Sequence, residues 1–101
     1  MICAVYFTAS NEREALRIGE LLVKERLAAC INVFPIKSIF WWKGKVERSE
    51  EVGVFVKTQE KLFSRIVKRI RELHSYDLPV IEKINVKSYK AIEKWVKTAT
   101  R

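Results

Sequence analysis

The stretch ACINVFPIKSIFWWKGKVERSEEVGVFVKT, residues 29–58, decides the fold of this chain. Its two halves are each of strand character, and Lys43 and Gly44 between them predict a tight antiparallel turn. Each half spans about a dozen residues or more, against roughly 5 or 6 in an ordinary strand, so the hairpin should project beyond its sheet. Pro35 interrupts the first half. Because proline cannot donate to the ladder, this half belongs at a sheet edge or at a bulge.

Two further runs predict the centre of the sheet. ICAVYFT, residues 2–8, and VGVFV, residues 52–56, are continuously apolar and lack alternation. Such runs are typical of strands that are buried on both faces. A fourth strand is expected over residues 80–87, where Ile81 lies among polar neighbours.

Helices are predicted from the spacing of apolar residues. Asn11, with Glu14 three residues on, favours a capped helix over residues 11–28. The predicted apolar face of this helix consists of Ala15, Leu16, Gly19, Leu22, Val23 and Leu27. Thr58 is expected to cap a second helix that ends near Leu73, and residues 88–100 predict a short C-terminal helix.

The order βαββαβ with a terminal helix predicts an α+β, ferredoxin-like sandwich of one domain, residues 1–101. Its strands should be arranged in the order 4, 1, 3, 2. This order puts the two continuously apolar strands in the centre and the strand with Pro35 on an edge. It also separates Cys3 from Cys30, which argues against a disulfide between them.

Composition limits the function classes. Twenty Lys and Arg against twelve Asp and Glu give a net charge of +8, which raises nucleic acid, acidic membranes and anionic ligands as partners. Both signs are interspersed, so solvated faces explain the charge more simply. Two cysteines and a single histidine exclude a four-ligand Cys or Cys₂His₂ zinc site within one chain. Without an apolar span or a basic leader, a soluble, cytoplasmic protein that needs no cofactor to fold is expected.

An RNA-binding module is one alternative, because RRM domains share this topology. VGVFV resembles their third-strand motif only in part: no basic residue precedes Gly53, and Phe55, the one aromatic after it, is expected to fill the core. A small hydrolase is the other alternative, but FTASNER, residues 7–13, contains no glycine to cradle a phosphate. RNA binding therefore stays an alternative with a partial motif, and enzymatic activity is not expected.

Several motifs occur in order along the chain and together resemble the CutA family of divalent-cation tolerance proteins. The matching positions are Ala28, Ala29, Cys30 and Asn32; Ser38, Phe40 in place of tyrosine, Trp42 and Gly44; Lys57 and Thr58; His74, Ser75, Tyr76, Asp77 and Pro79. The resemblance implies a compact homotrimer, related in architecture to the PII signalling proteins, whose long hairpin reaches a neighbouring subunit. It also implies a link to tolerance of copper and other divalent metals.

The resemblance to a metal-tolerance family suggests three candidate metal ligands in the chain. The Cys30 thiol and the His74 imidazole suit copper or zinc, and the Asp77 carboxylate could add an oxygen. One chain supplies few soft ligands, so three subunits would pool them at an interface, with copper as the favoured metal. A small buried hydrophobe remains the alternative for Cys30, and a hydrogen-bonded loop histidine the alternative for His74.

Five further residues are predicted to bind a ligand or to form the interface: Asn32, Trp42, Lys57, Tyr76 and Trp95. Lys57 beside Thr58 could hold an anion at a helix N-terminus, or be a solvated lysine. Trp95 is expected to pack the terminal helix down, and Trp42 to anchor the interface. The sequence thus predicts a homotrimer that binds a divalent metal ion or a small ligand at inter-subunit clefts. The alternatives are an RNA-binding module on the same fold and a purely structural or signalling trimeric scaffold.

Overall fold

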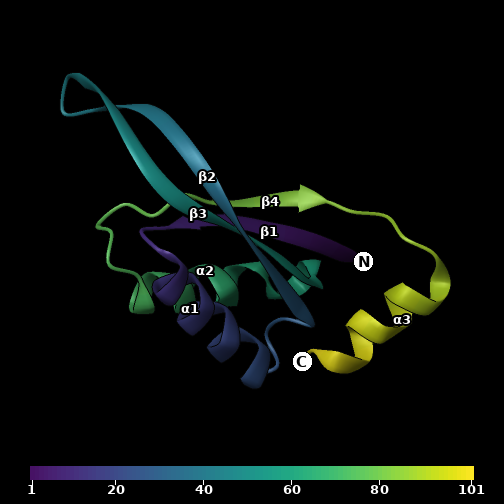
Figure 1. Cartoon of the computed structure of the whole chain (residues 1–101). Helices are drawn as coiled ribbons and strands as arrows, with labels where there is room; N and C mark the ends of the chain where they lie inside the picture. Colours follow the sequence, from purple (N-terminus) through teal and green to yellow (C-terminus); the bar gives the residue numbers. More distant parts are fainter.

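The computed structural model describes residues 1–101 and has the predicted order of elements (Figure 1). The elements are β1 (Ile2–Ala9), α1 (Glu12–Lys24), β2 (Cys30–Trp42), β3 (Lys45–Gln59), the 3₁₀ turn η1 (Glu60–Leu62), α2 (Phe63–Leu73), β4 (Ile81–Asn85) and α3 (Lys90–Ala99). The four strands lie in the order β2-β3-β1-β4 and every pair is antiparallel. The α+β, ferredoxin-like prediction is confirmed, with Pro35 on an edge strand.

The helices α1 and α2 cover one face of the sheet, and α3 lies at one end of it (Figure 1). Phe7, Val5 and Cys3 of β1 point toward the helices and belong to one core cluster of 14 buried residues. Val54 and Val56 of β3 face the same way. The continuous apolar runs therefore mark the central strands, as predicted.

Phe55 contradicts its predicted place in the core. Side chains alternate along a strand, so Phe55 points to the opposite face from Val54 and Val56. It is 39% exposed there. Part of the sheet face away from α1 and α2 is therefore open to solvent within one chain.

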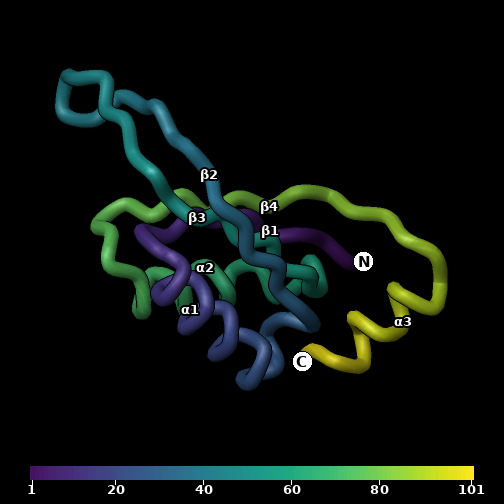
Figure 2. Tube along the Cα trace, in the orientation of Figure 1, coloured from purple at the N-terminus to yellow at the C-terminus, as the bar shows by residue number.

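The β2–β3 hairpin forms a long arm (Figure 2). β1 pairs with β3 only from Val52 to Gln59, whereas β2 and β3 continue to pair with each other as far as Trp42 and Lys45. Lys43 and Gly44 have φ angles of 50° and 78°, as a two-residue primed turn requires. The arm helps to give the molecule its dimensions of 45 × 23 × 21 Å.

Helix α1 is shorter than predicted, and its buried face is shifted. It ends at Lys24, because Arg26 has a left-handed φ of 65° and the chain turns back toward Leu22. The buried residues of α1 are Ala15, Ile18, Gly19 and Leu22. Leu16 and Val23, which were predicted to be on this face, are 45% and 36% exposed.

The predicted caps have different outcomes. The Asn11 side chain accepts a 2.8 Å hydrogen bond from the Glu14 N–H, so this cap is confirmed. Thr58 does not cap a helix: it is a buried residue of β3, and its hydroxyl donates to the Leu27 carbonyl at 2.6 Å. The Thr58 hydroxyl bonds to Leu27 instead of capping a helix because a buried hydroxyl needs a hydrogen-bond partner wherever packing places it.

The two cysteines are free, as predicted. Cys3 lies opposite Thr58 and Cys30 lies opposite Lys57, on the two sides of β3. The intervening strand keeps the thiols apart.

Candidate functional site

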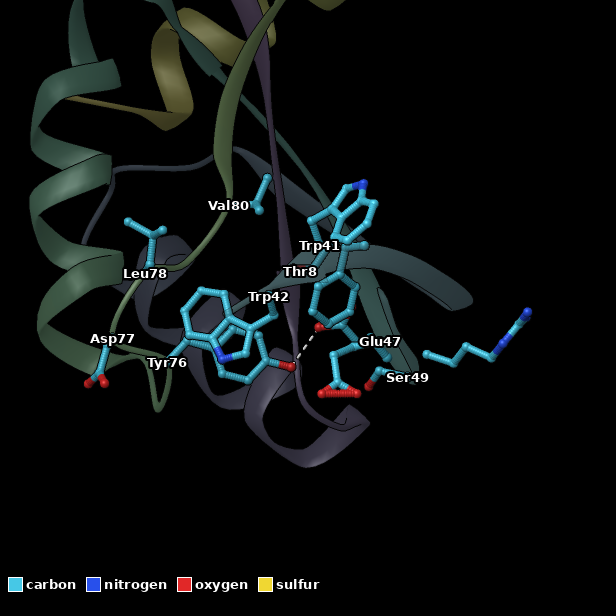
Figure 3. A pocket seen from close by; sticks show the side chains of 12 residues that line it. Thr8, Trp41, Trp42, Glu47, Ser49, Tyr76, Asp77, Leu78 and Val80 are labelled. Carbon is cyan, nitrogen blue, oxygen red and sulfur yellow. Dashed lines mark hydrogen bonds between the residues drawn. The ribbon is translucent and has the colours of Figure 1, made fainter. Parts of the chain in front are cut away.

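A cleft of about 600 Å³ lies between the arm and the loop that joins α2 to β4 (Figure 3). The arm contributes Phe40, Trp41, Trp42, Glu47, Arg48, Ser49 and Glu51; the loop contributes Tyr76, Asp77, Leu78 and Val80; β1 contributes Thr8. The cleft is lined by aromatic rings and carboxylates and is open to solvent on one side.

Tyr76 and Glu51 connect the two walls of the cleft. The Tyr76 hydroxyl donates a 2.6 Å hydrogen bond to Glu51 Oε2, shown by the dashed line in Figure 3. The pKa of Tyr76 is raised far above its usual value. Burial of the phenol is the largest cause, and this hydrogen bond to a carboxylate is the second. The phenol therefore stays a hydrogen-bond donor.

His74 lies behind Tyr76 and is hydrogen-bonded through both ring nitrogens. Nδ1 accepts the Tyr76 backbone N–H at 3.0 Å, and Nε2 is 2.6 Å from the Thr8 carbonyl oxygen. A carbonyl only accepts, so these two bonds assign the proton to Nε2. The side chain is fully enclosed, with Phe7 packed edge-on against the ring.

Glu14 fixes the beginning of the loop to the start of α1. Its carboxylate accepts from the Ser75 N–H at 2.8 Å and from the Ser10 N–H at 3.0 Å. Burial raises the pKa of Glu14, but the hydrogen bonds from Ser10 and Ser75 outweigh it and lower that pKa to about 2. Together, Glu14 and His74 hold the loop in a conformation that aims the Tyr76 hydroxyl at Glu51.

The three predicted metal ligands are not brought together within one chain. Cys30 lies beside Lys57 of β3, whereas His74 contacts Thr8, whose β3 partner is Gly53. Those two positions on β3 are about 13 Å apart along an extended strand. No group of three or more His, Cys, Asp and Glu side chains in the chain could hold a metal ion.

The surroundings of Asp77 and His74 also bear on whether these residues can bind a metal ion. Asp77 is exposed, and its carboxylate points away from the other labelled side chains of the cleft (Figure 3). His74 has no free ring nitrogen, so a metal would have to displace the Tyr76 N–H. The ligand roles of Cys30, His74 and Asp77 stay predictions.

Other predicted site residues are spread over the molecule. Lys57 lies within β3, and α2 begins only at Phe63, so the suggested anion site at a helix N-terminus is wrong. Trp95 of α3 is 43% exposed and Val96 beside it is fully buried, and the predicted role of Trp95 stays a prediction. Asn32 is exposed on the sheet face that the helices leave uncovered. Of the predicted ligand-binding residues, Trp42 and Tyr76 meet at the cleft.

Sequence reasoning missed an aromatic cluster on the uncovered sheet face. The ring centroids of Tyr6 and Phe55 are 5.8 Å apart, and the Phe34 ring is 5.8 Å from Phe55. The Phe34 ring lies over Gly53, where an added Cβ would come within 2.6 Å of it. Alternation counted inside the apolar runs, Tyr6 in one and Phe55 in the other, is the signal that could have found this cluster.

The geometry agrees with a known family. Residues 3–99 match the family model described as CutA1 divalent ion tolerance protein. The chain belongs to the CutA1 family. This confirms the resemblance that the motifs indicated.

Relatives of this CutA1 chain include the divalent-cation tolerance proteins CutA of Archaeoglobus fulgidus and Pyrococcus horikoshii. The first is 44% identical over 77 residues, 76% of each chain, and the second is 43% identical over 82 residues, 81% of this chain and 80% of the relative. The solved structure of the Archaeoglobus fulgidus protein, named periplasmic, has a TM-score of 0.96 at 38% identity over 98% of each chain. That of Thermus thermophilus has a TM-score of 0.96 at 33% identity over 100% of each chain.

Location differs among the CutA1 relatives. A rice relative, 35% identical over 96% of this chain and 56% of its own length, is named chloroplastic. In this CutA1 chain, none of the helices has the length and apolar character that crossing a membrane requires.

Proposed function

We propose that the chain serves divalent-cation tolerance as a homotrimer of the PII-like kind, which binds a divalent metal ion or a small ligand in clefts between subunits. The observation that carries the proposal is the exposure of large apolar side chains on the arm. On one face of the arm, Trp41 is 75% exposed, Ile39 63% and Val46 54%. Large apolar side chains gathered on one projecting element are typical of an interface, and a neighbouring subunit would remove them from water.

The uncovered face of the sheet supports the same assembly. Tyr6, Phe34 and Phe55 form a ring cluster there, and neither α1 nor α2 lies over it (Figure 1). Aromatic side chains bury large areas at interfaces and dominate their energetics. A homotrimer would give this face a covering layer.

The metal proposal follows from the family and needs more than one subunit. Soft divalent ions are bound by several N, S or O ligands, and one chain brings no three together. Pooled ligands, with Cys30 and Asp77 as the accessible candidates and copper as the favoured ion, would complete a site. His74 would contribute only after releasing the Tyr76 N–H.

The assembly is tested by multi-angle light scattering at micromolar concentration. We expect three times the chain mass of 11.9 kDa. A stable monomer under these conditions would overturn the proposal.

The metal is tested by titration calorimetry with Cu(II). Binding should weaken in Cys30→Ala and Asp77→Asn, and in His74→Ala if the ring turns toward the metal. Equal binding by the wild type and all three variants would exclude these residues as ligands. The proposal contains no catalytic step, and its setting is the cytoplasm.

An RNA-binding role is the second candidate, because one observation favours it. Tyr6 and Phe55 lie opposite each other on the two central strands and point to the uncovered face, as base-stacking aromatics do in RRM domains. Burial raises the pKa of Tyr6, and the carboxylates of Glu51 and Glu82 raise it further, so two negative charges lie near the ring. Such charge opposes a phosphate backbone. Gel-shift assays with single strands at low salt decide this, since RNA binding must fall steeply as salt is added.

A further inference from the structure

The cleft between the arm and the loop after α2 combines aromatic rings with negative charge. Figure 3 shows the Glu47 carboxylate and the rings of Trp41, Trp42 and Tyr76 around one space. Glu51 lies on the same wall, bonded to Tyr76. Arg48 is the one basic residue of the lining, although the chain as a whole carries a net charge of +8. We propose that this cleft binds a small organic cation, such as an alkylated ammonium group, against its aromatic rings.

Electrostatics favour a cation over an anion. Glu47, Glu51 and, at the rim, Asp77 oppose the single guanidinium of Arg48. Tyr76 responds to this field, because the charges of Glu51 and Glu14 add to burial in raising its pKa. Negative charge concentrated in a cleft of a basic protein attracts cations locally while the rest of the surface repels them.

The lining favours an organic cation over a metal ion. Half of the 12 lining residues are hydrophobic, and no three ligands converge. A hydrated divalent ion gains little from ring faces, because it needs several oxygen ligands at short distance. An alkylated ammonium group buries apolar surface and is also attracted by the negative face of the rings. The volume of about 600 Å³ suits a small molecule.

One ring of the cleft already accepts a cation. The Lys43 ammonium lies 5.9 Å from the centroid of the Trp42 ring, although Lys43 is not part of the lining. This distance is within the range of a cation–π contact. The arm therefore presents Trp42 in an orientation that a positive charge can approach.

The inference goes beyond the proposed function and does not depend on a metal. The arm has two faces: Phe40 and Glu47, which are register partners, line the cleft, whereas Ile39 and Val46 point the other way and line no part of it. Trp41 is the register partner of Val46 and belongs to that second face, although it also reaches the cleft lining. A neighbouring subunit that covers Ile39, Val46 and the outer side of Trp41 leaves Phe40, Trp42 and Glu47 to the cleft.

The test is a titration with tetramethylammonium chloride, followed by tryptophan fluorescence at constant ionic strength. We use Trp95→Phe as the parent, so that the signal comes only from Trp41 and Trp42. We expect a saturable change with a dissociation constant on the order of millimolar. tert-Butanol, a neutral molecule of similar size, should give no saturable change. An equal response to tert-butanol would overturn the inference.

Two variants and one control locate the site. Glu47→Gln and Trp42→Leu should each raise the dissociation constant roughly threefold or more. Glu20→Gln is the control, because Glu20 lies on α1, outside the cleft, and pairs with Lys24 at 3.3 Å; it should leave the constant unchanged. An unchanged constant in Glu47→Gln overturns the inference.

Two additional measurements separate this inference from the proposed function. The response should persist in EDTA, and its loss there would overturn the organic-cation assignment in favour of a metal. Light scattering on the same samples reports the assembly independently. A monomeric wild type that still binds tetramethylammonium would contradict the proposed trimer and support this inference.

Discussion

The hydroxyl of Tyr76 and the carboxylate of Glu51 lie 2.6 Å apart, and their hydrogen bond joins the loop after α2 to the base of the arm. It is the one side-chain hydrogen bond between these two segments. The positions of the loop and the arm, and hence the shape of the cleft, depend on it.

Tyr76→Phe should therefore destabilise the chain by about 1–2 kcal/mol, because a carboxylate loses a charge-assisted hydrogen bond in a partly buried place. Chemical denaturation measures this change in the free energy of unfolding. Tyr89→Phe is the matched control, since Tyr89 is 69% exposed and its hydroxyl has no partner in the chain. If both variants lose the same stability, the Tyr76 hydrogen bond does not hold the cleft.

Glu14 should make the free energy of unfolding depend on pH in the acidic range. Its pKa is lowered from 4.5 to about 2, so the folded state favours the carboxylate more than the unfolded state does. This stabilisation is fully present above about pH 4.5 and is lost as the pH falls toward 2; it amounts to about 2–3 kcal/mol at neutral pH. Glu14→Gln should be less stable at pH 7 and should show a flatter profile between pH 4.5 and 2. Glu20→Gln, measured in the same way, should follow the wild-type profile; a Glu14→Gln profile as steep as the wild type would contradict the prediction.

Gly53→Ala should disturb the aromatic cluster. The new Cβ would lie 2.6 Å from Phe34 Cε2, so the ring must move and lose contact with Phe55. We expect a loss of about 1–2 kcal/mol, as in other overpacked sites. In a Phe34→Ala background the same change should cost less, because the obstructing ring is absent. Denaturation of the wild type, the two single variants and the double variant gives the coupling free energy between Gly53 and Phe34. If Gly53→Ala loses the same stability with and without the Phe34 ring, the steric explanation is ruled out.

Ile39→Asp should weaken the proposed trimer. Ile39 is 63% exposed in one chain, so a charge there costs the isolated subunit little but would be expensive at a buried contact. The mass from light scattering should fall at low micromolar concentration, and the melting temperature at equal protein concentration should be lower than that of the wild type. Leu16→Asp is the control, because Leu16 is 45% exposed on α1 and away from the arm. A wild-type mass for Ile39→Asp would place the interface elsewhere.

The local patterns of the sequence predicted the fold well. Continuous apolar runs identified the central strands, Pro35 identified the edge, and Lys43-Gly44 identified the turn at the arm tip. The Asn11 cap was also correct. These features depend on residues close together in the chain, where backbone preference and side-chain alternation are decisive.

The sequence alone also placed Trp42 and Tyr76 among the residues that matter, and the structure brings both to one cleft. The sequence could not predict which residues surround these two side chains. Ser75 meets Glu14 across 61 positions, and His74 meets Thr8 across 66. No periodicity indicates such pairs.

Only the tertiary structure decided which groups satisfy one another. It moved Thr58 from a helix cap to the Leu27 carbonyl, and it turned Phe55 from the core to the surface. It also enclosed His74 between two hydrogen bonds, as in the hydrogen-bonded alternative that the sequence left open. The physical reason is that a buried polar group takes whichever partner packing brings within reach, and an apolar side chain is covered only where another element lies over it.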